Sequence, residues 1–257
     1  MKVSEIYNFL NEIAPFKNAD KTDNCGLLVG DMNAKAEKIL ICLDVTNAVV
    51  NEAIKKKADL IISHHPLMYR PVSKINKNDP LYALIASGIS FIAAHTNMDV
   101  AFGGIPDMML ELLGFPPSDI VLLPINTDGT GYGRITELDV PISAKELAEK
   151  CKTAFNCTVI RYTDSGRPIK KIGVSSGSAS ESVEAAFHAG CDAFICGEAR
   201  WDKLIYAENF GLTLIEAGHF HSEDIYCIPL RDKLKRKFPE IEVEKAESST
   251  DFCCYIT

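Results

Sequence analysis

Residues 58–66, ADLIISHHP, decide the fold class of this chain. The first six residues form a short, mostly apolar run, which is typical of a strand buried on both faces of a sheet. The run ends in His64, His65 and Pro66, and a proline cannot donate a hydrogen bond to a strand ladder, which favours a strand end there. Two imidazoles therefore follow a buried strand at a point where they need not face opposite sides of a sheet.

Similar patterns lie on either side of this segment. Residues 38–43 (KILICL) predict another apolar strand, and residues 46–57 predict a helix that Thr46 or Asn47 caps. Residues 2–14 and 79–87 also predict helices, and the strand expected at 89–94 ends in His95. Apolar strands that alternate with helices favour a largely parallel or mixed sheet covered by helices.

The turn-rich segment NTDGTGYG at 126–133 indicates a boundary between two lobes. Beyond it we expect strands at 133–140, 158–162, 171–175, 193–196 and 212–217. Helices are expected at 143–155, 180–189 and 222–238, the last interrupted at Pro229. The predicted architecture is two α/β lobes, with residues 1–125 in the first and 126–223 in the second. Residues 224–257 are expected to pack back on the first lobe.

The composition excludes several classes of protein. The 257 residues include 27 basic and 35 acidic side chains, and the net charge of −8 disfavours nucleic acid and anionic membranes as partners. No apolar run approaches the roughly 18 residues of a membrane span, and the first residues do not resemble a signal peptide. The nine cysteines are odd in number and contain no CxxC pair, which indicates reduced thiols. We expect a soluble, cytoplasmic protein.

Three apolar strands end in side chains that bind metals: LIISHHP, FIAAHTNMD and LTLIEAGHFHSE. Ligands bind beyond the carboxyl ends of strands in open α/β sheets, so these segments can meet in one crevice. Asp99 follows His95 by four residues, and Glu223 follows His219 by four, so each pair would share one face of a helix. Adjacent histidines can arise by chance, and a single carboxylate can serve a helix start. Neither alternative explains why a histidine precedes both carboxylates.

Three histidines and two carboxylates are more ligands than one four-coordinate metal ion needs. Two divalent ions about 3.5 to 4 Å apart would use such a set. Mixed imidazole and carboxylate ligation suits zinc, iron, manganese or nickel. The predicted metal ligands are His64, His65, Asp99, His219 and Glu223.

Weaker candidates lie near other strand ends. Asp44 and Asp23 could line the same crevice or serve as turn and capping residues. Gly177, and the pair Gly197 and Glu198, could accept a phosphate or ribose at a helix N-terminus, although neither site forms a complete fingerprint. His221 could be a spare ligand or a substrate contact.

Four segments together resemble the Nif-three-like family, whose bacterial members are often labelled GTP cyclohydrolase I type 2 homologs. They are DNCGLLVGD (23–31), ISHHPLMYR (62–70), AAHTNMDVAFGG (93–104) and GEARWDKLIYAENFGLTLIEAGHFHSE (197–223). The resemblance implies a two-lobed Nif-three-like α/β fold with two similar lobes, a dinuclear site and a toroidal homohexamer. By motif, the metal ligands are the same five side chains, and His95 is the histidine beside the metals that contacts substrate or moves a proton.

The expected function is that of a dinuclear metal-dependent hydrolase. A metal-bound hydroxide would attack carbon or phosphorus of a small substrate, for which a nucleotide-like molecule is one option, and His95 would act as acid or base. The alternative is a non-catalytic metal-binding scaffold or regulator that acts through a homo-oligomeric ring. Both hypotheses use the same ligands, so the sequence leaves them open.

Overall fold

The computed structural model describes residues 1–256, and the chain divides into two compact units. The first unit comprises Met1–Met98 and Tyr226–Thr250, and the second comprises Asp99–Ile225 and the residues from Asp251 onward. The chain leaves the first unit within helix α4 (Thr96–Val100). The turn-rich segment at 126–133 instead joins two antiparallel strands of the second unit.

The first unit contains a five-stranded sheet in the order β1-β4-β3-β2-β11. Strand β1 pairs antiparallel to β4, and the other neighbours pair in parallel, so the expected mixed and largely parallel sheet is confirmed. The strands are β1 (Gly26–Val29), β2 (Lys38–Cys42), β3 (Leu60–Ser63), β4 (Ser90–Ala93) and β11 (Glu242–Lys245).

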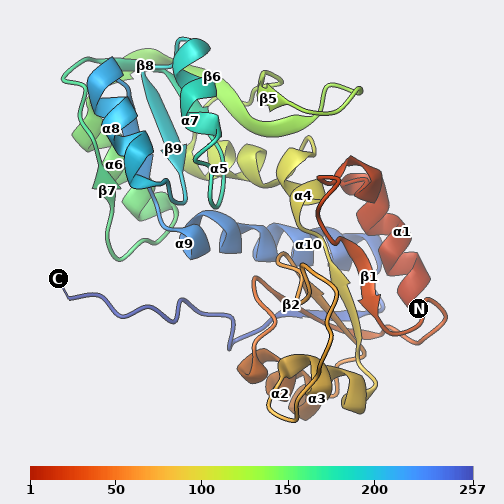
Figure 1. Ribbon diagram of the computed structural model, residues 1–257. Coiled ribbons are helices and arrows are strands. Elements are labelled where there is room, and N and C mark those ends of the chain that lie inside the picture. Colours follow the sequence, from red (N-terminus) through yellow and green to blue (C-terminus); the bar gives the residue numbers. More distant parts are fainter. Residues whose placement is uncertain (257) are drawn as a thin grey trace. The chain divides into compact units, whose positions relative to one another are not determined.

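Helices cover both faces of this sheet, with α2 and α3 below it and α1 and α10 above it in Figure 1. Their starts follow local capping chemistry, because Thr46 Oγ1 accepts from the Val49 amide at 3.3 Å and Asp79 Oδ1 accepts from the Leu81 amide at 2.8 Å. The helices of this unit are α1 (Val3–Ile13), η1 (Phe16–Asn18), α2 (Asn47–Lys56), α3 (Pro80–Ser87) and α10 (Cys227–Lys237).

The parallel register of β2, β3 and β4 aligns their carboxyl ends. Cys42 lies opposite Ser63, and Ser63 lies opposite Ala93. Because the three strands end at the same level, the residues that follow them emerge at one edge of the sheet. This edge carries the histidines singled out in the sequence.

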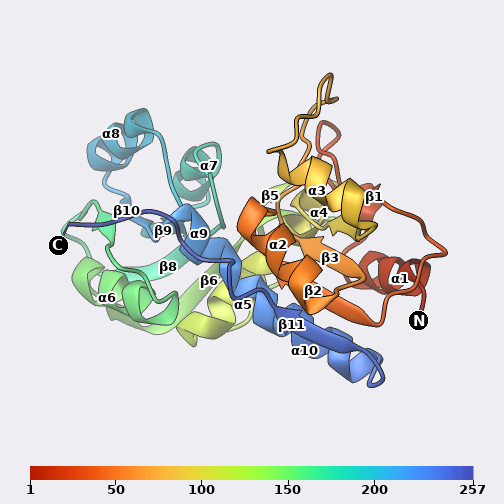
Figure 2. The same cartoon turned by 90° about the horizontal axis from the view of Figure 1, so that it is seen from below.

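The second unit contains a six-stranded mixed sheet in the order β5-β6-β8-β9-β10-β7. Strands β8, β9 and β10 pair in parallel, and the other neighbours pair antiparallel. Figure 2 shows α7 and α8 on one face and α5 and α6 on the other. The strands are β5 (Val121–Pro124), β6 (Gly131–Ile142), β7 (Arg161–Tyr162), β8 (Ile169–Val174), β9 (Ala193–Cys196) and β10 (Thr213–Glu216). The helices are α5 (Ile105–Leu113), α6 (Ala144–Ala154), α7 (Ser182–His188), α8 (Trp201–Phe210) and α9 (His219–Glu223).

Two expected elements differ from the structure. The strand expected at 158–162 is reduced to the two exposed residues of β7 at the sheet edge, where few side chains are buried. The helix expected at 222–238 is replaced by α9, the 3-10 turn η2 (Asp224–Tyr226) and α10. Pro229 lies in the first turn of α10, where a missing backbone N–H breaks no helical hydrogen bond. The break therefore precedes the proline.

Arg134 on β6 is fully buried inside the second unit. Its Nε and Nη2 donate to both carboxylate oxygens of Asp107 at 3.0 and 2.9 Å. Further hydrogen bonds reach the carbonyls of Ala101 at 2.7 Å and Gly133 at 2.8 Å, and the guanidinium lies 4.8 Å from the centroid of the Phe102 ring. The cation thus joins β6 to α5 and the segment before it.

Glu52 joins α2 to the segment after β11. Its carboxylate accepts hydrogen bonds from the amides of Glu247 at 3.0 Å and Ser248 at 2.9 Å and from Lys56 at 3.0 Å. Burial raises the pKa of Glu52, but these hydrogen bonds, with that of the Ser248 hydroxyl, outweigh it and lower the pKa to about 2.

We expect Glu52→Gln to lower the free energy of unfolding by about 1–2 kcal/mol at neutral pH. The folded pKa is depressed, so the stabilisation is present above the unfolded pKa of about 4.5 and is lost as pH falls toward 2. Urea unfolding of both proteins between pH 7 and pH 2.5 measures this effect. The exposed Glu240→Gln is the matched control in the same unit. A destabilisation that stays constant with pH would contradict this account.

Within residues 1–256, no helix combines the length and apolar character needed to cross a membrane. All nine cysteines are free thiols, as the sequence predicts, and most are buried. Cys253 and Cys254 are the two exposed ones, near the end of the chain.

Candidate metal centre

The first unit gathers three histidines at the carboxyl edge of its sheet. His64 and His65 follow β3, and His95 follows the parallel neighbour β4. Because β3 ends at Ser63, the two adjacent rings escape the alternation of a strand, and their centroids lie 5.1 Å apart. Each of the three rings offers a nitrogen within 4.8 Å of those of the others. These imidazoles could hold a metal ion.

Each of these rings is oriented by an oxygen at Nδ1. The Nδ1 of the buried His64 lies 2.9 Å from the carbonyl oxygen of Ala94. That of His65 lies 2.7 Å from Oδ1 of Asp44, which comes shortly after β2. A carbonyl or carboxylate oxygen only accepts, so Nδ1 carries the hydrogen and Nε2 carries the lone pair that a metal ion needs.

Asp23 orients His95 in the same way, with Oδ2 2.9 Å from Nδ1. The same oxygen accepts from the Thr96 hydroxyl at 2.6 Å and the Cys25 thiol at 2.9 Å. Burial raises the pKa of Asp23, but the hydrogen bonds from His95, Cys25 and Thr96 outweigh it and hold the pKa well below its usual range. Asp23 is therefore ionised. On the other side of the His95 ring, Nε2 lies 3.4 Å from the hydroxyl of Tyr69.

The second unit gathers two carboxylates and one histidine. His219 and Glu223 share one turn of α9, with Nε2 and Oε2 3.0 Å apart, which confirms the expectation from their spacing. One oxygen of Asp99 lies within 4.8 Å of one of Glu223, and Ser176 donates to Asp99 at 2.9 Å. Asp99 and Glu223 are both buried. Two buried like charges at this separation favour a cation beside them.

The loops after β8 and β9 complete the surroundings of this second set. Glu198 Oε1 lies 3.1 Å from Nδ1 of His219, which directs Nε2 of this ring toward Oε2 of Glu223. Gly177 has a φ of +57°, and a β-carbon added there would lie 2.9 Å from Cδ of Glu223 and overlap Oε1. Its amide donates to the Ser222 hydroxyl at 3.0 Å. Only glycine lets the backbone approach the Glu223 carboxylate this closely.

The residues fit divalent metal ions by three observations. Four imidazoles, three of them predicted ligands and the fourth His95, are oriented at Nδ1 by oxygen acceptors. Two buried carboxylates lie close together. The backbone of Gly177 leaves room at the carboxylate. This donor set suits zinc, iron, manganese or nickel and is poor for calcium or magnesium, which prefer oxygen ligands.

Comparisons with known proteins agree with this fold. The sequence profile of the Duf34/NIF3 (NGG1p interacting factor 3) family matches residues 1–251. The chain belongs to the Duf34/NIF3 family. A relative from Clostridium perfringens, named GTP cyclohydrolase 1 type 2 homolog, is 34% identical over 243 residues, which cover 92% of both chains.

Solved structures place the chain in the Duf34/NIF3 fold. Staphylococcus aureus hypothetical protein SA1388 is similar with a TM-score of 0.91 and 28% identity, covering 100% of this chain and 99% of the other. A Bacillus cereus protein related to NIF3 has a TM-score of 0.90 at 21% identity, again covering 100% and 99%. The second similarity shows the fold alone.

The structure resolves several open alternatives for the Duf34/NIF3 chain. Asp23 contacts His95 and also caps the turn at Thr96, so both of its suggested roles apply. Glu198 orients His219. His221 contacts Asp251, with Nε2 3.3 Å from Oδ2.

Tyr69, a contact of His95, was not predicted from the sequence. Its only signal was its position three residues after Pro66.

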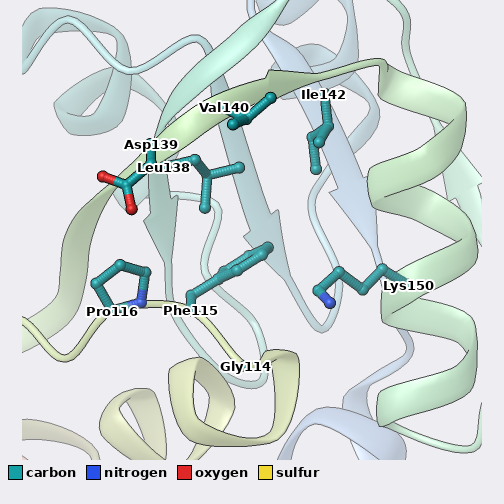
Figure 3. A pocket seen from close by; sticks show the side chains of 8 residues that line it. All are labelled: Gly114, Phe115, Pro116, Leu138, Asp139, Val140, Ile142 and Lys150. Carbon is teal, nitrogen blue, oxygen red and sulfur yellow. The ribbon is translucent and has the colours of Figure 1, made fainter.

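A separate pocket of about 530 Å³ lies in the second unit between the end of α5, strand β6 and helix α6. In Figure 3 the Lys150 side chain points into it, and Phe115 lies opposite Val140 and Ile142. The lining contains no histidine and a single carboxylate, Asp139. Its chemistry is not that of a metal site, and none of the predicted ligands lines it.

We expect Gly177→Ala to lower metal affinity at least about tenfold, because the new methyl group displaces the Glu223 carboxylate. The positive φ adds a cost of about 1–2 kcal/mol in the free energy of unfolding. Gly190→Ala is the matched control, since Gly190 has a φ of +74° in the same unit and open space around its α-carbon. Metal titration followed by calorimetry measures both variants. Equal metal affinity in the two alanine variants would show that Gly177 does not support Glu223.

Proposed function

We propose that this Duf34/NIF3 protein is a dinuclear metal-dependent hydrolase of a small, nucleotide-like substrate. Its metal ligands would be His64, His65, Asp99, His219 and Glu223, with His95 as acid or base. The observation that carries the proposal is the orientation of four imidazoles by oxygen atoms at Nδ1. Carboxylate and carbonyl partners of this kind accompany metal-binding histidines and fix their tautomers.

The two sets of side chains are complementary in charge and donor type. From the first set His64 and His65 would supply two imidazoles, and the second set would supply two carboxylates and one imidazole. Two divalent cations carry four positive charges, so three imidazoles alone would leave them poorly neutralised. We therefore propose that both sets serve one pair of ions. When bound, such a pair would lower the pKa of a water molecule and polarise a carbonyl or phosphoryl oxygen of the substrate.

Side chains of the protein would carry out the proton transfer. His95 would take a proton from the attacking water at Nε2, and the ionised Asp23 at Nδ1 would stabilise the imidazolium that forms. His95 then returns this proton to the leaving group as the bond to it breaks. The Tyr69 hydroxyl, 3.4 Å from Nε2, is placed to contact the substrate or to pass the proton on.

The name of the curated relatives, GTP cyclohydrolase 1 type 2 homolog, agrees with hydrolysis of a nucleotide-like molecule. We propose a cytoplasmic, ring-shaped homohexamer, which light scattering would detect as six times the chain mass of 28.2 kDa.

A turnover screen tests the enzymatic proposal. Metal-loaded protein is assayed against nucleotides, phosphoesters and cyclic amides, beside the variants His64→Ala and Glu223→Ala. Activity that both variants abolish while their circular dichroism is unchanged supports the hydrolase. No turnover of any compound, with about two ions bound per chain, would favour a metal-binding scaffold that acts through the assembled ring.

A further inference from the structure

The loop between β3 and α3 carries an unusual charge for this chain. Residues 67–78, which we call the cationic loop, contain Arg70, Lys74 and Lys77 and no acidic residue. The whole chain has a net charge of −8. The loop forms no helix or strand, and in Figure 2 it is the orange segment that projects beyond α3.

Both ends of the cationic loop are attached to the first unit by asparagine side chains. Asn24 Nδ2 donates to the carbonyl of Met68 at 2.6 Å, and Asn47 Nδ2 donates to that of Asn78 at 3.1 Å. Next to the first attachment, the rings of Tyr69 and His95 are nearly perpendicular, with centroids 5.5 Å apart. The loop therefore begins in contact with the imidazole set of the candidate metal centre.

The three cations of the loop are exposed and make no ion pair with any carboxylate of residues 1–256. Lys56, in contrast, forms ion pairs with three glutamates. Apolar side chains alternate with the cations of the loop and are also exposed, namely Tyr69 at 54%, Val72 at 45% and Ile75 at 44%. A surface that mixes free cations with apolar groups suits an organic anion.

We propose that the cationic loop binds the phosphate end of the substrate, so that the substrate class is a small phosphorylated molecule. The inference rests on the proposed function, because it names the substrate of the same site. Arg70 would hold two phosphate oxygens through its planar guanidinium, and Lys74 and Lys77 would add point charges. Tyr69 would contact the organic part of the substrate beside His95. Three cations on a net-acidic chain suit a small anion better than a nucleic acid backbone.

Binding of inorganic pyrophosphate, followed by calorimetry, tests the anion site. Arg70→Gln is expected to weaken binding at least about tenfold and Lys74→Gln about fivefold, since hydrogen bonds to charged groups are the strong ones. Lys55→Gln changes another exposed lysine, on α2 of the same unit; it is the matched control and should change affinity less than about twofold. Equal affinity of wild type and Arg70→Gln would overturn the proposal.

Repeating the titration on metal-stripped protein separates this inference from the proposed function. If metal-stripped wild type binds pyrophosphate and metal-stripped Arg70→Gln does not, the result supports the anion site on the loop. This outcome does not depend on whether the metal centre is catalytic. Pyrophosphate that binds only metal-loaded protein, with equal affinity for Arg70→Gln, would overturn the loop site and leave the metal centre standing. The metal content of Arg70→Gln should equal that of wild type.

A second comparison tests the place of Tyr69. A purine nucleoside diphosphate is titrated beside pyrophosphate into wild type, Tyr69→Phe and Tyr69→Ala. The affinity gained by adding the nucleoside to pyrophosphate should persist in Tyr69→Phe and fall at least about fivefold in Tyr69→Ala, since the base stacks on an aromatic ring. An unchanged gain in Tyr69→Ala would overturn the contact between Tyr69 and the organic part.

Discussion

Wild-type protein purified without added metal is expected to contain about two divalent ions per chain, and Glu223→Gln fewer than one. Glu223 is buried, lies 3.0 Å from Nε2 of His219 and has an oxygen within 4.8 Å of one of Asp99. The amide keeps the shape of the side chain but removes its charge. Loss of an outer partner alone costs about 10–100-fold in metal affinity, so loss of this ligand should cost at least about 100-fold. Elemental analysis measures the metal content.

Glu208→Gln is the control for this prediction, because Glu208 is an exposed carboxylate on α8 of the same unit. It should keep the metal content of wild type. Chelation should lower the thermal midpoint of wild type and leave that of Glu223→Gln nearly unchanged. Ions at 1,000 times their dissociation constant stabilise the native state by about 4 kcal/mol. Wild-type metal content in Glu223→Gln, with intact circular dichroism, would exclude Glu223 as a ligand.

Arg134→Ala is expected to lower the free energy of unfolding of the second unit by about 3–5 kcal/mol. The guanidinium is fully buried and binds both oxygens of Asp107 and the carbonyls of Ala101 and Gly133. Truncation leaves these acceptors without their cation and opens a cavity beside Phe102. Urea unfolding measures the loss, and hydrogen exchange of β6 and α5 amides localises it to this unit.

Arg200→Ala is the control, since Arg200 forms two ion pairs, with Glu181 and Asp202, but is exposed. It should change stability little, because exposed pairs are screened by water and salt. Asp107→Asn should recover part of the loss in the double variant, because it removes the carboxylate that Arg134→Ala leaves unpaired. A loss no larger than that of Arg200→Ala would mean that the buried cation is replaceable by water.

The sequence predicted the fold best where local patterns agree with the sheet. The apolar run at 58–63 predicted β3, and the run at 89–94 predicted β4. Because parallel neighbours end at one edge, the sequence could also predict that His64, His65 and His95 lie together. The spacing of His219 and Glu223 predicted their shared helical turn.

Other strand pairings and side-chain contacts between residues far apart in the sequence could not be predicted. Strand β11 has the sequence EVEK, which lacks an apolar pattern, and it forms because β2 offers a parallel edge about 200 residues earlier in the chain. Asp23 reaches His95 across 72 residues, and Glu198 reaches His219 across 21. No periodicity encodes such contacts. They depend on tertiary packing, which the local pattern does not specify.

The oxygen atoms that orient the histidine rings affect which metal ions the site would bind. Rings held by Ala94, Asp44, Asp23 and Glu198 lose their rotational freedom when the chain folds, before any ion arrives. Preorganised imidazoles would accept several transition metals at little reorganisation cost, in the order of their intrinsic affinities. The identity of the resident ion should then follow the supply of metals in the growth medium, and soaking crystals in a competing salt should exchange it without disturbing the lattice.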